Sequence, residues 1–162
     1  MKKIVLLLFL CIPVTMYGQS RAMRNISDKY EDAFTMVFYY STLKMVIPED
    51  RKELKELIYG IEKIKMLRID NENGLLSNAD IEIIKADLIR DNYEEGLSMR
   101  MGGKKTFAYI RENNGTMKGL FILISEDASS TIFDLIGEIP IDKLFTLTKE
   151  IETLTENAII FK

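Results

Sequence analysis

Two short turn sequences in the second half of the chain constrain its fold more than any other feature. Gly102-Gly103 and Asn113-Asn114-Gly115 each lie between short runs rich in apolar and β-branched residues. Asn and Gly adopt positive φ at little cost, which tight hairpins require. The pattern therefore predicts an antiparallel meander of four short strands, at about 97–101, 106–111, 117–125 and 131–137.

The first half of the chain alternates helical and extended patterns. Strands are expected at 34–42, which is rich in aromatic and β-branched residues, and at 61–69. Helices are expected at about 21–31, from Pro48 to Gly60, from a capping box at Ser77 and Asp80, and from Asp142 to near the end.

This element order predicts a single α+β domain. Its α-β-α-β-α half calls for two crossover connections and parallel pairing of the first strands, whereas the meander must be antiparallel. We expect one mixed sheet of about six strands that ends in the four-strand meander, with helices mainly on one face.

The first eighteen residues have the three-part composition of a secretory signal peptide. Lys2 and Lys3 give a positive end, and an apolar run from Ile4 to Ile12 follows and is broken by Pro13. The run is too short to span a bilayer. We therefore expect a signal peptide at 1–18, one domain at 19–162, and export to the periplasm or the outer membrane.

Two cleavage sites fit this segment. A cut after Gly18 makes Gln19 the first mature residue, whereas a cut after Ser20 places small residues at both recognition positions. Cys11 lies inside the apolar run and follows Leu10 instead of a small residue. A lipid anchor on Cys11 is therefore not expected.

Composition excludes several classes of chemistry from the expected mature chain. The sequence has no His and no Trp, and its single Cys lies in the signal segment. Nucleophilic catalysis that needs an imidazole base is excluded, as are zinc, haem and iron–sulfur sites built from Cys or His. Removing the two lysines of the signal segment changes the net charge from −3 to −5. An acidic chain with no basic block does not predict nucleic-acid binding.

Short motifs add no catalytic site. Ser41-x-x-Lys44 matches a β-lactamase-type motif but lacks its companion sequences. The segment Asp70–Gly74 resembles a calcium loop, yet glycine occupies its fifth position and Ile81 its twelfth. We expect no cofactor and no metal.

A possible interaction face remains. Tyr39 and Tyr40 point to opposite faces of their expected strand, so one of them should lie near the surface. In the strand at 117–125, Phe121 and Leu123 share one face while Leu120 and Ile122 share the other. Both faces are apolar, which predicts a central strand with helices on one side. Tyr39, Phe121 and Leu123 are the candidate interaction residues.

The order of these segments is similar to a known family. The segments Phe34–Tyr40, Ile61–Arg68 and Tyr93–Leu144 resemble the domain of unknown function 4252 family of exported Bacteroidetes proteins. The resemblance implies a short exported protein, and it supplies no functional residues. Many members of the family are lipoproteins; this chain departs from them because it lacks a convincing lipobox, so a membrane tether is not expected.

Two functions stay open at this point. The first is a non-catalytic periplasmic binding module whose partner is another envelope protein. The second is a carboxylate-based hydrolase acting on envelope glycans, which needs two acids across a cleft. The missing catalytic groups favour the first, so we expect a protein that is not an enzyme.

Overall fold

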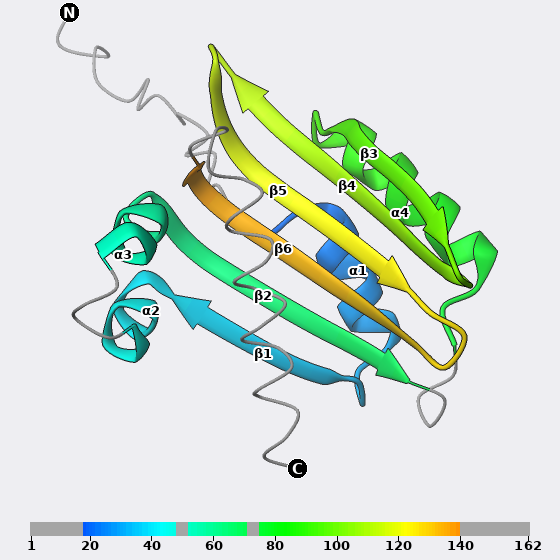
Figure 1. The fold of residues 1–162 in the computed structure, drawn as a ribbon. Helices are drawn as coiled ribbons and strands as arrows, with labels where there is room; N and C mark the ends of the chain where they lie inside the picture. The colour runs from blue at the N-terminus through cyan, green and yellow to red at the C-terminus, as the bar shows by residue number, and fades with distance from the viewer. Residues whose placement is uncertain (1–17, 48–51, 71–74, 140–162) are drawn as a thin grey trace, which may run out of the picture.

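The computed structural model describes residues 18–47, 52–70 and 75–139 (Figure 1). The helices are α1 (Arg21–Lys29), α2 (Tyr40–Val46), α3 (Lys52–Ile58) and α4 (Asn78–Arg90). The strands are β1 (Phe34–Tyr39), β2 (Ile61–Asp70), β3 (Glu94–Met101), β4 (Lys104–Asn113), β5 (Thr116–Ser125) and β6 (Ser129–Ile139). Most of the expected signal peptide and the expected helix from Asp142 lie outside the described residues.

The six strands form one open sheet in the order β1-β2-β6-β5-β4-β3, and every neighbouring pair is antiparallel. The α+β class, the six strands and the meander β3 to β6 are confirmed. The parallel pairing expected for the first two strands is wrong. The connection through α2 and α3 stays at one end of the sheet, so the chain reverses direction between β1 and β2 (Figure 1).

The two hairpin turns lie where the sequence predicts them. Gly102 and Gly103 join β3 to β4 with φ of 57° and 83°, and Asn114 and Gly115 join β4 to β5 with φ of 51° and 79°. Two successive residues at positive φ match the right-handed twist of the flanking strands. These turns set the register in which Phe107 lies opposite Leu123.

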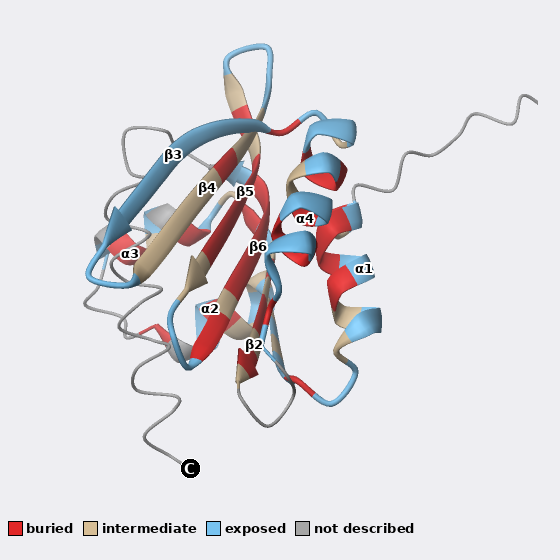
Figure 2. Cartoon of the chain, turned by 90° about the vertical axis from the view of Figure 1, so that its right-hand side faces the viewer, coloured by how far each residue is buried: buried red, intermediate tan, exposed pale blue. Residues whose placement is uncertain are grey.

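Helices α1 and α4 cover one face of the sheet, and their buried sides face it (Figure 2). Polar contacts join the two helices: Asn25 Nδ2 donates to Asp87 at 2.6 Å, and Lys29 Nζ donates to Asp80 at 2.5 Å. The core between helices and sheet contains Ala22, Met23, Ile26, Ala33, Leu67, Ile69, Leu76, Ile81, Ile84, Leu88, Tyr93, Tyr109, Phe121, Leu123 and Ile132.

Both of these helices begin at a serine cap. Ser20 Oγ accepts a hydrogen bond from the Met23 N–H at 3.2 Å at the start of α1. The capping box predicted for α4 is confirmed, because Ser77 and Asp80 exchange hydrogen bonds between side chain and backbone. Each cap provides acceptors for amides that have no partner within the first helical turn.

A second core lies on the opposite face of the sheet, where α2 and α3 pack at one corner. The sequence predicted a strand through Thr42, but β1 ends at Tyr39 and α2 begins at Tyr40. Leu43 and Ile47 lie one helical turn apart and are both buried in this core. Burial of these side chains outweighs the strand preference of the aromatic and β-branched residues before them.

Candidate functional site

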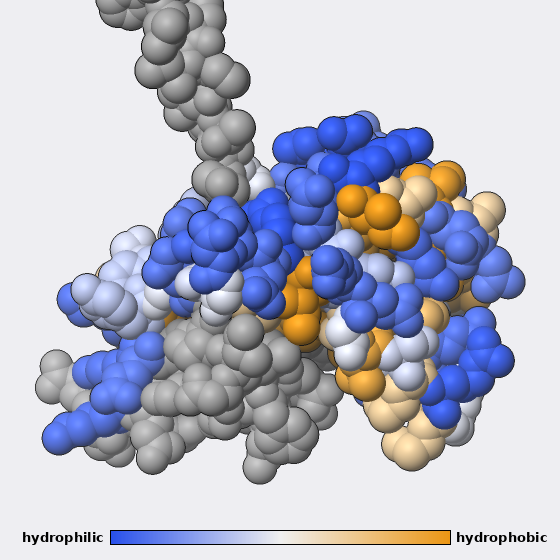
Figure 3. Space-filling view, turned by 90° about the horizontal axis from the view of Figure 1, so that it is seen from above, coloured by the Kyte–Doolittle hydropathy of each residue, from blue (hydrophilic) through white to orange (hydrophobic). Residues whose placement is uncertain are grey.

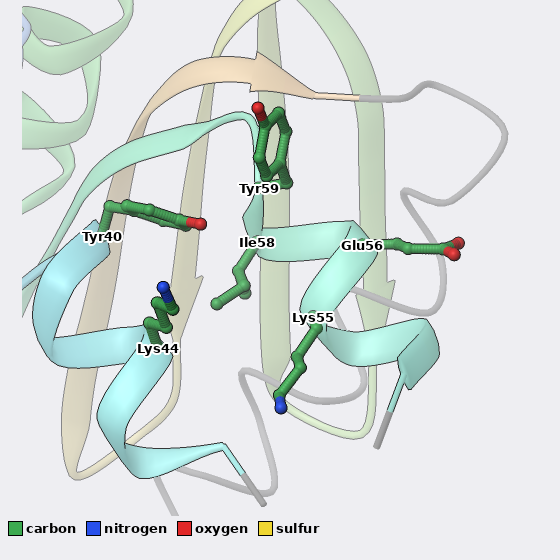
Figure 4. A pocket seen from close by; sticks show the side chains of 6 residues that line it. All are labelled: Tyr40, Lys44, Lys55, Glu56, Ile58 and Tyr59. Carbon is green, nitrogen blue, oxygen red and sulfur yellow. The ribbon is translucent and has the colours of Figure 1, made fainter. Parts of the chain in front are cut away.

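The short helices α2 and α3 form the corner of the molecule that carries the first candidate site. Leu43, Leu54 and Ile58 turn inward to the core, which fixes both helices against the sheet. Their remaining sides face each other and the solvent across a gap (Figure 4). The helices therefore present a surface that the core does not use.

A pocket of about 340 Å³ lies in this gap. Tyr40 and Lys44 enter it from α2, one helical turn apart. Lys55 enters from α3, and Tyr59 follows at the end of the same helix with the same spacing. Each helix thus contributes one phenol and one ammonium group to the same pocket.

Ile58 and the two tyrosine rings give the pocket its apolar surface. Ile58, which is buried in the core, forms the inner side of the pocket, whereas Glu56 points away from the gap (Figure 4). The rings of Tyr40 and Tyr59 meet edge to face with centroids 6.3 Å apart. Tyr59 is nevertheless 79% exposed, so most of its ring is available to a ligand. The pocket combines aromatic surface, hydroxyl groups and positive charge, which suits an anionic group attached to an apolar body.

A second pocket of about 290 Å³ lies where β4 and β6 end and β2 and β5 begin, lined by Glu62, Asn113, Lys118, Ile136, Gly137 and Glu138. Its two carboxylates are the kind of pair that a carboxylate-based hydrolase requires. Glu138, however, forms an ion pair with Lys118 across the β5–β6 pair. Part of the charge in this pocket is therefore already neutralised within the protein.

A buried carboxylate lies beneath the start of α1. Asp134 of β6 is 1% exposed, and its Oδ2 accepts hydrogen bonds from the Ser20 N–H at 2.8 Å and the Ser20 hydroxyl at 2.9 Å. Burial raises the pKa of the Asp134 carboxyl, although the Ser20 hydrogen bonds and the charges of Arg111 and Lys63 oppose that rise. Because Asp134 is enclosed, it serves the fold and cannot meet a substrate.

The predicted interaction residues do not form one surface. Tyr39 is 55% exposed at the end of edge strand β1, with Lys63 Nζ 5.9 Å from its ring centroid. Phe121 and Leu123 are 0% and 2% exposed, because α1 and α4 cover their face of the sheet. The expectation that these two residues offer a face to a partner is therefore corrected.

Sequence reasoning missed the pocket because it extended the strand across Tyr40. The repeated spacing of Tyr with Lys, at 40 and 44 and again at 55 and 59, is the signal that could have revealed it. That spacing has meaning only if both segments are helical. The exposed tyrosine expected at 39 or 40 is present, since Tyr39 lies at the surface.

Apolar surface is also exposed at the opposite edge of the sheet. All eight residues of β3 are exposed, and Leu97, Met99 and Met101 are the large apolar ones among them. Figure 3 shows hydrophobic surface on the right-hand side, where β3, β4 and α4 lie. An edge strand of this kind can pair with another chain.

Neither a metal centre nor a membrane span is found within the described ranges. No group of three or more His, Cys, Asp or Glu side chains there could hold a metal ion. None of the helices from α1 to α4 is long and apolar enough to cross a bilayer.

Comparison with known proteins identifies a family but no characterised relative. No curated protein and no solved structure matches the chain. The sequence pattern of one family, described as a domain of unknown function (DUF4252), matches residues 25–147, a range that runs from α1 past the end of β6. Because the match covers most of the chain, the protein belongs to the domain of unknown function 4252 family.

Proposed function

We propose that this protein is a non-catalytic binding module of the bacterial envelope, exported to the periplasm, and that the α2–α3 pocket is its ligand site. The observation that carries the proposal is the paired arrangement of Tyr40 with Lys44 and of Lys55 with Tyr59 around one pocket. Export is supported by the composition of residues 1–18.

The partner that fits this pocket is an acidic segment of another envelope protein that also carries an aromatic or aliphatic side chain. Lys44 and Lys55 supply positive charge in a chain whose net charge is −3. A carboxylate can lie near these ammonium groups while an adjacent ring packs on the exposed Tyr59. The pocket has six lining residues and Tyr59 is largely exposed, so we expect binding in the micromolar range or weaker.

The hydrolase hypothesis has less support. A glycoside hydrolase needs two carboxyl groups on opposite sides of an accessible cleft, one of them with a raised pKa. Burial raises the pKa of the Asp134 carboxyl, but that group is enclosed under Ser20. Glu62 and Glu138 line the second pocket, and Lys118 already pairs with Glu138. For these reasons binding is preferred over hydrolysis.

A titration followed by ¹⁵N–¹H NMR tests whether the pocket requires negative charge on its ligand. Benzoate is the probe and benzamide, which keeps the ring but lacks the charge, is its matched control. We expect benzoate to shift amide signals of α2 and α3 and benzamide to shift them less. Equal shifts from both probes, or shifts spread over the whole sheet, would contradict an anion-binding pocket.

Capture from the native envelope fraction tests the partner. Lys44→Glu and Tyr59→Ala should each abolish capture of a protein that the wild type retains. Lys52→Glu changes the same charge on the exposed side of α3, and Tyr39→Ala removes an exposed tyrosine outside the pocket. Both controls should retain the partner. Loss of capture with Tyr39→Ala alone would move the binding site to the end of β1.

A further inference from the structure

The start of α1 distinguishes between the two possible cleavage sites. Gly18 is exposed, Gln19 is half-buried, and Ser20 is 1% exposed. The chain therefore enters the folded domain between Gly18 and Ser20. A peptidase that cuts after Gly18 leaves Ser20 in the mature protein, whereas one that cuts after Ser20 removes it.

Ser20 makes three contacts that the domain uses. Its Oγ caps α1 by accepting from the Met23 N–H at 3.2 Å, and the same hydroxyl donates to Asp134 Oδ2 at 2.9 Å. Its backbone N–H donates to the same oxygen at 2.8 Å. Without Ser20, α1 loses its cap and Asp134 loses both donors while remaining buried under the helix.

We propose that the export signal peptidase cuts the bond between Gly18 and Gln19, so that Gln19 is the first residue of the mature protein. Water adds across this peptide bond: the Gly18 carbonyl becomes a carboxylate of the released peptide, and Gln19 gains an α-amino group. The proposal rests on the export part of the proposed function and is independent of the α2–α3 pocket.

The surroundings of Gln19 suit a new amino terminus. The Gln19 carbonyl accepts from Arg24 Nη1 at 3.1 Å, which holds this residue against α1. Two residues after Gln19, the Arg21 N–H donates to Asp91 Oδ2 at 2.6 Å. Asp91 and Asp134 thus place two carboxyl groups at the start of α1, and Asp91 also forms an ion pair with Arg21 Nε at 3.5 Å. A carboxylate such as that of Asp91 is favourable beside the positive end of a helix.

The amino terminus of the protein recovered from the envelope fraction decides the cleavage site. We expect intact mass and amino-terminal peptide sequencing to show a chain that begins at Gln19, with or without loss of ammonia from that glutamine. A chain that begins at Arg21 would overturn the proposal while leaving export intact. A full-length chain in the cytoplasm would overturn export as well.

Thermal unfolding of purified variants tests whether the fold needs Ser20. In a protein that begins at Gln19, Ser20→Ala should lower the Tm by roughly 5–10 °C, because a cap and a hydrogen bond to a buried carboxylate are lost together. Ser27→Ala is the matched control, since the Ser27 hydroxyl donates to the Met23 carbonyl and accepts from Lys65 Nζ at 2.9 Å, but it neither caps α1 nor contacts a buried carboxylate. Equal Tm values for Ser20→Ala and Ser27→Ala would show that the fold does not need Ser20, and would remove the basis of the proposal.

Discussion

The close contact between Gly119 and Tyr93 gives the sharpest test of the packing under α4. A Cβ added at Gly119 would lie 2.5 Å from the Tyr93 hydroxyl oxygen and 3.1 Å from the ring carbon Cζ. Tyr93 is fully buried, so its ring cannot swing away into solvent. Gly119→Ala therefore forces a shift inside a close-packed core.

The expected change in the free energy of unfolding for Gly119→Ala is the difference between two opposing effects. Overpacking a well-filled core costs about 1–3 kcal/mol, whereas replacing glycine in a strand returns about 0.5–1 kcal/mol of backbone entropy. We expect Gly119→Ala to lower the free energy of unfolding by roughly 1–2 kcal/mol. For a domain of this size, that change corresponds to a fall in Tm of roughly 5 °C.

Removing the Tyr93 hydroxyl tests whether contact with this group causes the cost of Gly119→Ala. The hydroxyl is buried and has no hydrogen-bond partner among the described residues, and burial raises its pKa, so the phenol stays neutral. Tyr93→Phe should therefore cost nothing or stabilise the protein by up to about 1 kcal/mol. In the Tyr93→Phe background the closest atom is gone, and the cost of Gly119→Ala should fall by about 1 kcal/mol.

Urea unfolding followed by far-UV circular dichroism measures all four proteins of this cycle. Gly96→Ala is the control, because a Cβ there meets the flexible end of Ile110 at 2.9 Å and the residue is exposed. Its free energy of unfolding should change by less than about 0.5 kcal/mol. If Gly119→Ala is as stable as the wild type, or if its cost is the same in the Tyr93→Phe background, the described packing of Tyr93 on β5 is incorrect.

Three further predictions concern charge, backbone strain and metal independence. Burial would raise the pKa of Asp80, but hydrogen bonds from Lys29, Ser77 and Tyr30 outweigh it and lower that pKa to about 2. Asp80 therefore contributes roughly 2 kcal/mol of stability above about pH 4, and this contribution is lost as the pH falls through its folded pKa. Asp80→Asn should reduce this acid-induced loss of stability, measured by urea unfolding at a series of pH values. An unchanged dependence of stability on pH would refute the contribution of Asp80. Gly115→Val should destabilise the protein by about 1–3 kcal/mol, because φ is +79° there and a β-branched residue is strained at that angle; a Tm equal to that of the wild type would contradict the turn. We expect the mature protein to keep its Tm in EDTA and in reductant, since its sequence offers no thiol or imidazole ligand; a large fall in EDTA would reveal a carboxylate metal site.

Features that depend on neighbouring residues could be predicted from the sequence. The positive φ of Asn114 and Gly115 and the capping box of Ser77 with Asp80 involve residues a few positions apart. Their energies depend little on the rest of the chain. The apolar character of both sides of β5 likewise predicted a central strand, and β4 and β6 do flank it.

Only the tertiary structure decided which element covers which face. The alternation of side chains along β5 put Phe121 and Leu123 on one face of the sheet, but it could not reveal that α1 and α4 cover that face. Asp134 accepts hydrogen bonds from Ser20, which lies 114 positions away in sequence, so its place in the fold could not be read from its neighbours. The pocket depends on β1 ending at Tyr39, which follows from burial of the α2 side chains and not from the strand preference of the residues before them. Contacts between distant segments gain their free energy from burial within the completed fold, and a local pattern does not encode that burial.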